Sequence, residues 1–202
     1  PERVPTLHIR ASEWFIQQGL HRKAIKHSLA ARDYQRAATS IRTIAIEIIQ
    51  QGEHTTVVRW INVLPEKLVR EHPYLSILHA WALQLMGQLE TANVRLLEAE
   101  NALDSMQYED DENLNTILGL IHSRRAYATF MTGEHDKTIT YAHQALDQLP
   151  ETATLIRAQT ALFLGIAYRY RGQLQAALEI YKETLPLTRR MGGNALAVLS
   201  FL

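Results

Sequence analysis

Apolar residues recur at helical spacing along most of the chain. From Leu75 they return every three or four positions, at Leu78, Ala82 and Leu85, which places them on one face of an α-helix. A denser apolar run over residues 155–168 predicts a helix buried on more than one side. The sequence has few valines and no Asn-Gly hairpin turn, so strands are not expected. The pattern predicts an all-α protein of about eleven helices in antiparallel pairs.

A short repeated segment marks the turns between these helices. A turn residue, usually Gly, is followed five positions later by a small residue that opens the next helix. The six pairs are Gly19 and Ala24, Arg32 and Ala37, Gly52 and Val57, Gly87 and Ala92, Gly133 and Thr138, and Gly172 and Ala177. Glycine supplies the left-handed conformation that lets the chain reverse. The small residue is expected where two antiparallel helices approach closely.

The last copy carries more than a turn. Its residues fall at the small–aromatic–Gly–Ala–aromatic offsets of a tetratricopeptide repeat, at Gly165, Tyr168, Gly172, Ala177 and Tyr181. The chain therefore resembles a tetratricopeptide-like α–α superhelix, a solenoid of antiparallel helix pairs. The glycine spacings of 46 and 39 residues exceed the ~34 of a plain repeat, so longer helices or loops are expected. Pro65 and Pro150 are expected to end helices, and Pro73 to open one.

Composition excludes several classes of protein. The 202 residues hold 21 Lys+Arg and 21 Asp+Glu, and a net charge of zero argues against a surface devoted to nucleic acid. The absence of Cys excludes disulfides and thiolate metal sites and fits a reducing, cytoplasmic location. No apolar stretch approaches a membrane span. The acidic run Glu109–Glu112 is interpreted as a solvated connection before a helix.

No motif in the sequence predicts catalysis. Phosphate loops, dinucleotide-binding glycine motifs, His-Glu-x-x-His and Gly-x-Ser-x-Gly are all missing. The nine His are scattered without a third ligand at helical spacing, so no metal site is expected. His21, His54 and His135 are expected at half-exposed helix starts. The chain is predicted to have no catalytic residue and not to be an enzyme.

Arginine pairs and tryptophans have structural interpretations. In each pair, Arg124-Arg125 and Arg189-Arg190, one side chain is expected in solvent and the other in an ion pair, since neighbours point about 100° apart on a helix. Three indoles are expected to pack between helices with N–H at an edge: Trp14, Trp60 and Trp81.

The first half of the chain carries a more particular succession of motifs. Leu7-His-x-Arg-Ala-Ser-Glu-Trp-Phe15 is followed by Ala24-Ile-Lys-His-Ser-Leu-Ala-Ala-Arg-Asp-Tyr34. Trp60-Ile-x-x-Leu-Pro65 and His72-Pro-x-Leu75 come next. This succession resembles the large LuxR-type transcriptional regulators related to MalT. The resemblance covers essentially the whole chain and is most specific over residues 7–100.

The resemblance implies an organisation and a function. Residues 1–65 would be a helical junction resembling the end of a winged-helix and linker region, and residues 66–202 would be tetratricopeptide-like repeats truncated at the C-terminus. The chain would be the sensor region of an ATP-dependent activator, and a piece of a longer protein, since it lacks an initiator Met and stops in the apolar run Ala195–Leu202.

In this interpretation the present residues bind no cofactor. ATP would be bound by a missing N-terminal part, and DNA by a missing C-terminal helix-turn-helix. The partners would be a small-molecule inducer, a regulatory protein or, through self-association, a second copy of the chain. The alternative is a free-standing tetratricopeptide adaptor that binds a peptide or protein in its concave groove.

The repeat offsets also predict which residues line that groove. The first helix of each pair would expose seven polar or aromatic side chains: Tyr74, Trp81, Gln84, Ser123, Tyr127, Arg169 and Tyr170. Aromatic rings, an amide and a guanidinium suit a sugar-like or peptide ligand through stacking and hydrogen bonds. The alternative is that these side chains complete the packing between repeats.

Overall fold

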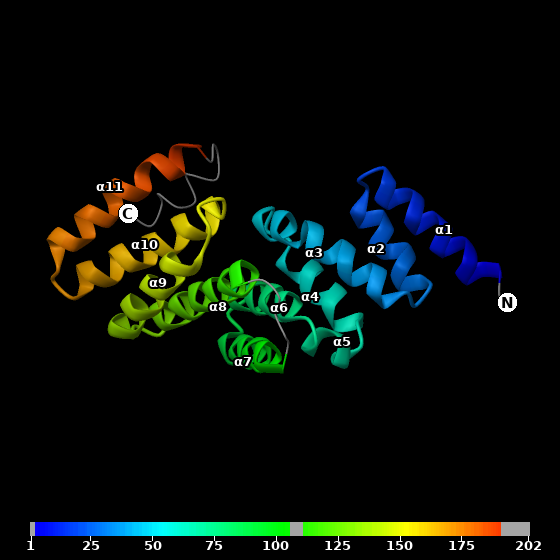
Figure 1. Cartoon of the computed structure of the whole chain (residues 1–202), viewed down its shortest axis with the longest axis horizontal. Helices are drawn as coiled ribbons and strands as arrows, with labels where there is room; N and C mark the ends of the chain where they lie inside the picture. The colour runs from blue at the N-terminus through cyan, green and yellow to red at the C-terminus, as the bar shows by residue number, and fades with distance from the viewer. Residues whose placement is uncertain (1–2, 106–110, 191–202) are drawn as a thin grey trace. The chain divides into compact units, whose positions relative to one another are not determined.

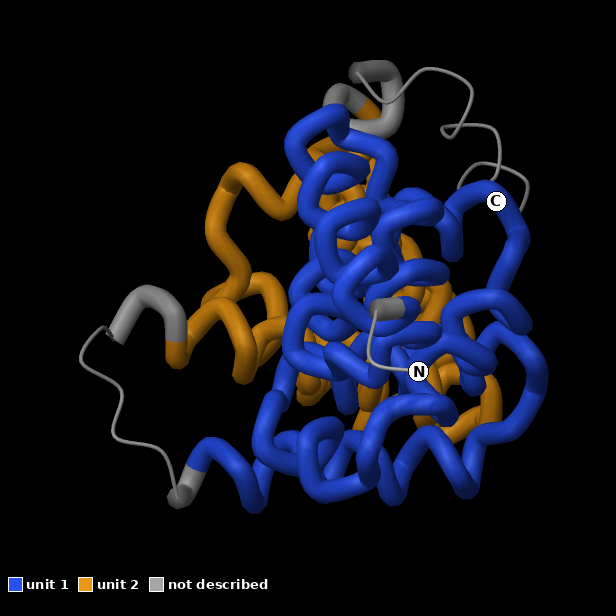
Figure 2. Tube along the Cα trace, turned by 90° about the vertical axis from the view of Figure 1, so that its right-hand side faces the viewer, with its two compact units in different colours: residues 1–105 blue, residues 106–202 orange. Residues whose placement is uncertain are grey.

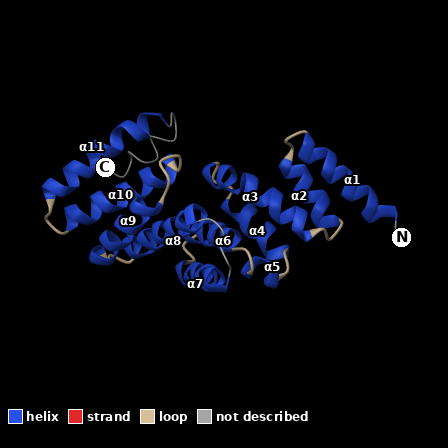
Figure 3. Ribbon diagram, viewed as in Figure 1, coloured by secondary structure: helices blue, strands red, loops and turns tan. Residues whose placement is uncertain are grey.

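A computed structural model describes residues 3–105 and 111–190, and over these residues every regular element is a helix (Figures 1 and 3). The helices are α1 (Arg3–Gln17), α2 (His21–Ala30), α3 (Tyr34–Gln50), α4 (His54–Val63), α5 (Glu66–Arg70), α6 (Pro73–Leu85), α7 (Leu89–Ser105), α8 (Asp111–Met131), α9 (His135–Gln148), α10 (Thr154–Tyr170) and α11 (Leu174–Arg190). The predicted fold class, all-α with tetratricopeptide-like antiparallel helix pairs, is confirmed. None of these helices combines the length and apolar character needed to cross a membrane.

The predicted turns are confirmed at all six positions. The five turn glycines have φ between 70° and 81°, and Arg32 has φ 58°, so even the one non-glycine residue adopts the left-handed conformation. In the first turn the Leu20 amide donates to the Phe15 carbonyl at 2.8 Å. The small residues five positions on are at most 3% exposed, because two helices meet at each of them.

Unit 1, residues 1–105, is one of two compact units (Figure 2). In it α1 packs on α2, α2 on α3, and α3 on α4, while α6 packs against α3, α4, α5 and α7. Pro73 is the first residue of α6, as expected. The centre of the unit is aliphatic, with Ile25, Ile41 and Leu75 fully buried.

Unit 2 comprises residues 106–202, and its described residues, 111–190, form four helices. In it α8 packs on α9, and α10 packs against α8, α9 and α11. Its core contains Ala126, Ala142 and Leu164. A Cβ built on Gly165 would lie 2.3 Å from Cε1 of Tyr181, so this position must be glycine for the ring to pack as it does.

The predicted division at residues 65 and 66 lies inside unit 1. That division concerns modules of a longer protein, which compact units do not test, and it stays a prediction. The side chains of Glu109–Glu112, Arg189 and Arg190, and the whole run Ala195–Leu202, lie outside the described residues.

The prediction for Trp14 is wrong. Its side chain is 53% exposed and contacts the neighbouring Phe15 edge-on, with ring centroids 5.1 Å apart. The main packing of α1 is against α2, so the outer face of α1 has no helix over it in the described part of the chain. Trp81 is 4% exposed and Trp60 half-buried, as expected.

Candidate functional site

The seven predicted groove residues are divided between the two units. Tyr74, Trp81 and Gln84 lie on α6 in unit 1, and the other four lie on α8 and α10 in unit 2. Each group is therefore a surface of its own unit.

On α6 the expectation of exposed groove residues fails for two of three. Trp81 is 4% exposed and Gln84 is 2% exposed, because α6 is buried continuously over residues 75–84. Tyr74 is half-buried, and the Arg42 guanidinium of α3 lies 5.6 Å from its ring centroid. Burial raises the pKa of Tyr74, while Arg42 acts in the opposite direction. This face of α6 is mainly packing.

On α8 the expectation of an exposed Ser123 is also wrong. Ser123 is fully buried, and its Oγ lies 2.7 Å from Oγ1 of Thr160 on α10. Arg124 donates from Nη2 to the same Ser123 oxygen at 3.1 Å. A buried hydroxyl needs such partners, and here they join two neighbouring helices. Ser123 therefore holds α8 to α10 and does not face a groove.

The Arg124-Arg125 prediction is wrong as well, since neither side chain is exposed. Arg124 is 3% exposed, and burial lowers its pKa to about 10. Arg125 is half-buried, with its guanidinium 5.6 Å from the ring centroid of Tyr141 on α9. Both cations therefore belong to the packing of unit 2, where an aromatic face and hydroxyls surround them.

Aromatic side chains gather where α8 and α10 lie side by side. Tyr127 meets Phe163 edge-on with centroids 5.4 Å apart, and Phe130 stacks on Phe163 at 5.2 Å. All three rings are half-buried. Sequence reasoning found Tyr127 but missed the two phenylalanines. The signal was available, because Phe130 follows Tyr127 by three residues and so shares its helix face.

Tyr170, at the end of α10, is the most exposed aromatic of the predicted set. It is 65% exposed and stacks on His135 of α9, with centroids 4.6 Å apart and planes 6° from parallel. Its neighbour Arg169 is exposed too. We call Tyr127, Phe130, Phe163 and Tyr170 the aromatic surface of unit 2.

The three helix-start histidines behave alike. His21, His54 and His135 are the first residues of α2, α4 and α9, and each is half-buried, which confirms the prediction for them. Of the three, His135 stacks on an aromatic ring within the described part of the chain, that of Tyr170.

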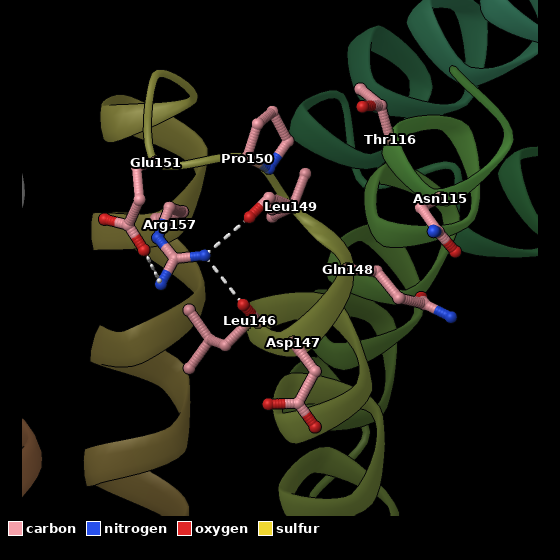
Figure 4. Close-up of a pocket in the computed structure, with 9 residues that line it drawn as sticks. All are labelled: Asn115, Thr116, Leu146, Asp147, Gln148, Leu149, Pro150, Glu151 and Arg157. Atoms are coloured by element: carbon pink, nitrogen blue, oxygen red, sulfur yellow. Dashed lines mark hydrogen bonds and ion pairs between the residues drawn. The ribbon is translucent and has the colours of Figure 1, made fainter. Parts of the chain in front are cut away.

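A separate cavity of about 440 Å³ opens beside the loop between α9 and α10 (Figure 4). Arg157 closes one side by donating from Nη1 to the carbonyls of Leu146 and Leu149, both at 2.7 Å, and by an ion pair with Glu151 at 3.1 Å. These carbonyls are left without intrahelical partners at the end of α9. Arg157 therefore caps a helix, and its charge is already compensated.

The aromatic surface of unit 2 and the cavity beside Arg157 both offer groups that suit contact with a ligand. Over the described residues no group of three His, Asp or Glu side chains is placed to hold a metal ion. The aromatic surface has four rings, two of them with a hydroxyl edge, and a guanidinium nearby at Arg169, which together provide apolar area and a few hydrogen bonds. Such a surface suits binding of a peptide or a small ligand.

Comparison with known proteins adds a sequence relationship. Residues 118–190 match the tetratricopeptide repeat family. Over 187 residues, or 93% of this chain, the sequence is 27% identical to the HTH-type transcriptional regulator MalT of Yersinia pestis (strain Pestoides F) and 26% identical to that of Serratia proteamaculans. The chain spans about a fifth of the length of these relatives, since the match covers 20% of each. No solved structure matches.

The two comparisons cover different parts of the chain. The repeat match begins in α8 and ends with α11, so it lies wholly in unit 2. The similarity to MalT covers nearly the whole chain and therefore includes both units. The chain is thus similar to a transcription regulator throughout, and to tetratricopeptide repeats where the aromatic surface lies.

Proposed function

We propose that this chain is the sensor region of a LuxR-type, MalT-like transcription activator that depends on ATP. The observation that carries the proposal is the similarity to MalT over 93% of the chain. ATP and DNA would be bound by other parts of a longer protein, because the sequence has neither a phosphate loop nor a glycine motif for nucleotides. The role of these residues is to bind an inducer or a regulatory protein in the cytoplasm.

The aromatic surface of unit 2 is the contact region of this proposal. Its rings are partly accessible, and Tyr170 is exposed for 65% of its area. Aromatic side chains give large contact area at low entropic cost, and they are enriched at protein and ligand interfaces. An effector bound there controls activation only if it binds the active and inactive states with different affinity.

The test is a thermal-shift screen of the chain against sugars, amino acids and short peptides. A hit is repeated with Tyr170→Ala, which removes an exposed ring without opening the core. Leu174→Ala is the matched control, because Leu174 is also 65% exposed and lies on the other side of the Gly172 turn. We expect the Tyr170 variant to weaken binding by about tenfold or more, a loss of about 1.4 kcal/mol, and the control to bind normally. Equal binding by both variants would exclude this surface.

A tetratricopeptide adaptor that holds a peptide is the second candidate, and the repeat match over residues 118–190 favours it. The two proposals differ in the consequence of binding. In a longer protein, an effector of an activator changes DNA binding or ATP hydrolysis, whereas a peptide held by an adaptor changes neither.

A further inference from the structure

Polar contacts hold the first helix on the second. Nδ1 of His8 on α1 lies 2.8 Å from Nδ1 of His27 on α2. One turn further along, Ser12 Oγ lies 2.6 Å from Ser28 Oγ and also donates to the carbonyl of Ala24 at 3.2 Å. Both serines are fully buried. The interface therefore includes hydrogen bonds that cross from one helix to the other.

The histidine contact has a strict proton requirement. A hydrogen bond between two imidazole nitrogens needs one N–H and one lone pair. Two neutral rings meet this requirement, and so does a pair with one extra proton, which makes the bond charge-assisted. Two protonated rings present two N–H groups to each other and two positive charges at close range. The second proton therefore turns attraction into repulsion.

The surroundings of the pair oppose that second proton. The Phe15 ring lies 5.3 Å from the His27 ring, and Lys23 lies over Phe15. Burial lowers the pKa of His27, with smaller contributions in the same direction from His8 and Lys26. The carboxylates of Glu13 on α1 and Asp33 before α3 are each paired with Arg36.

Several large apolar side chains of α1 lie outside its interface with α2. Val4, Leu7 and Trp14 are exposed for 58%, 62% and 53% of their area, so these large side chains do not face α2. Arg36 adds two contacts from α3, donating from Nη1 to the carbonyl of Ile9 at 3.2 Å and pairing with Glu13 at 3.1 Å. When the histidine bond is lost, the serine contacts, the Arg36 contacts and the partly buried Phe15 and Ile16 still hold α1, so a weakened docking of α1 is expected first at the His8 end.

We propose that His8 and His27 form a proton-sensitive latch, which holds α1 on α2 near neutral pH and releases α1 when both rings are protonated. The direction follows from linkage. A detached His27 binds a proton near its ordinary pKa of about 6.5, whereas the docked ring has a lowered pKa. Docking of α1 is therefore favoured above about pH 6.5 and weakens as the pH falls through that value.

Hydrogen exchange tests the release directly. Protection factors of α1 amides are measured at about pH 7.5 and pH 5, with α10 amides as the internal reference. We expect the wild-type α1 protection to fall by about tenfold more than that of α10. In the double variant His8→Gln/His27→Gln, whose amides bond at any pH, the extra fall should be below about threefold. His143→Gln is the control, since His143 bonds to Tyr168 in unit 2, and it should behave as wild type.

A titration of the His8 and His27 rings in the wild-type protein, followed by NMR, tests the proposal even if the double variant does not fold. Two coupled rings take up protons in separate steps, so the second step of the pair should come well below the first. Equal loss of α1 protection in wild type and double variant would overturn the proposal. Independent titration of both rings near pH 6.5 would overturn it as well.

Discussion

The two units share their turns but differ in what fills the space between helices. Eight residues before its turn glycine, α6 of unit 1 carries His79, and α10 of unit 2 carries Leu164. One residue later the two helices carry Ala80 and Gly165. All four positions are buried. The common turn thus fixes which positions face inward, while the residue placed there decides how each unit responds to acid and to added volume.

His79 makes unit 1 the acid-sensitive unit at this position. The side chain is 2% exposed, and neither ring nitrogen has a hydrogen-bond partner among the described residues. The pKa of His79 is lowered to about 4, mainly by burial and also by the Arg95 charge, while Glu66 acts in the opposite direction. Leu164, its counterpart, has nothing to protonate.

His79→Leu should give unit 1 the acid tolerance of its neighbour. Because the pKa of His79 is lowered in the folded protein, protonation of His79 costs no stability above about pH 6.5. Below that pH the unfolded chain takes up the proton first, so the free energy of unfolding decreases as the pH falls towards 4. At pH 4.5 protonation of His79 alone should lower the free energy of unfolding of the wild type by roughly 2–3 kcal/mol. The His79→Leu variant should not show this decrease. Urea unfolding followed by tryptophan fluorescence measures it, because all three tryptophans lie within residues 1–105 and report on unit 1 alone.

The matched control is His143→Leu, an exposed histidine of unit 2. It should leave the pH dependence of the tryptophan signal unchanged. If His79→Leu and wild type lost the same stability between pH 7 and pH 4.5, the burial of a neutral His79 would not be the source of acid sensitivity.

The regular part of the fold could be predicted from the sequence. The turn at Arg32 was found without a glycine, because the small residue Ala37 keeps its offset, and Arg32 does have φ 58°. Such features depend on neighbours in sequence. Which face of a helix is exposed does not depend on sequence neighbours alone. For this reason the prediction that Trp81, Gln84 and Ser123 are exposed is wrong. Their burial depends on contacts from distant helices, as the bond from Ser123 to Thr160 shows.

The aromatic surface and the histidine pair show the same limit. Phe130 and Phe163 are 33 positions apart, and His8 and His27 are 19 apart. No periodicity within one helix connects such residues. Only the packing of α8 on α10, and of α1 on α2, brings each pair together.

Gly165→Ala gives α10 of unit 2 the residue that α6 of unit 1 has at the matching position, Ala80. The new Cβ would lie 2.3 Å from Cε1 of Tyr181, so the ring on α11 must move. Overpacking of this kind costs about 1–3 kcal/mol, and the higher helix propensity of alanine offsets about 1 kcal/mol of that cost, so we expect a net loss of up to about 2 kcal/mol. Urea unfolding followed by far-UV circular dichroism should show the loss in the transition of unit 2.

A second substitution separates crowding from other causes. In a Tyr181→Leu background, where the ring is absent, Gly165→Ala should cost much less, and the coupling between the two sites should exceed about 0.5 kcal/mol. Additive effects of the two substitutions would mean that the ring does not require the glycine.

An exchange of turn residues should have the smallest effect, because the two units are alike there. Arg32→Gly in unit 1 removes a side chain from a left-handed conformation and should raise stability by about 0.5–1 kcal/mol. Gly172→Arg in unit 2 should lower stability by about 1 kcal/mol. A Cβ at Gly172 meets no atom within 4 Å, so this loss comes from the backbone alone. Thermal unfolding of each variant measures the two changes in stability. Changes of the same sign would show that the two turns are not equivalent.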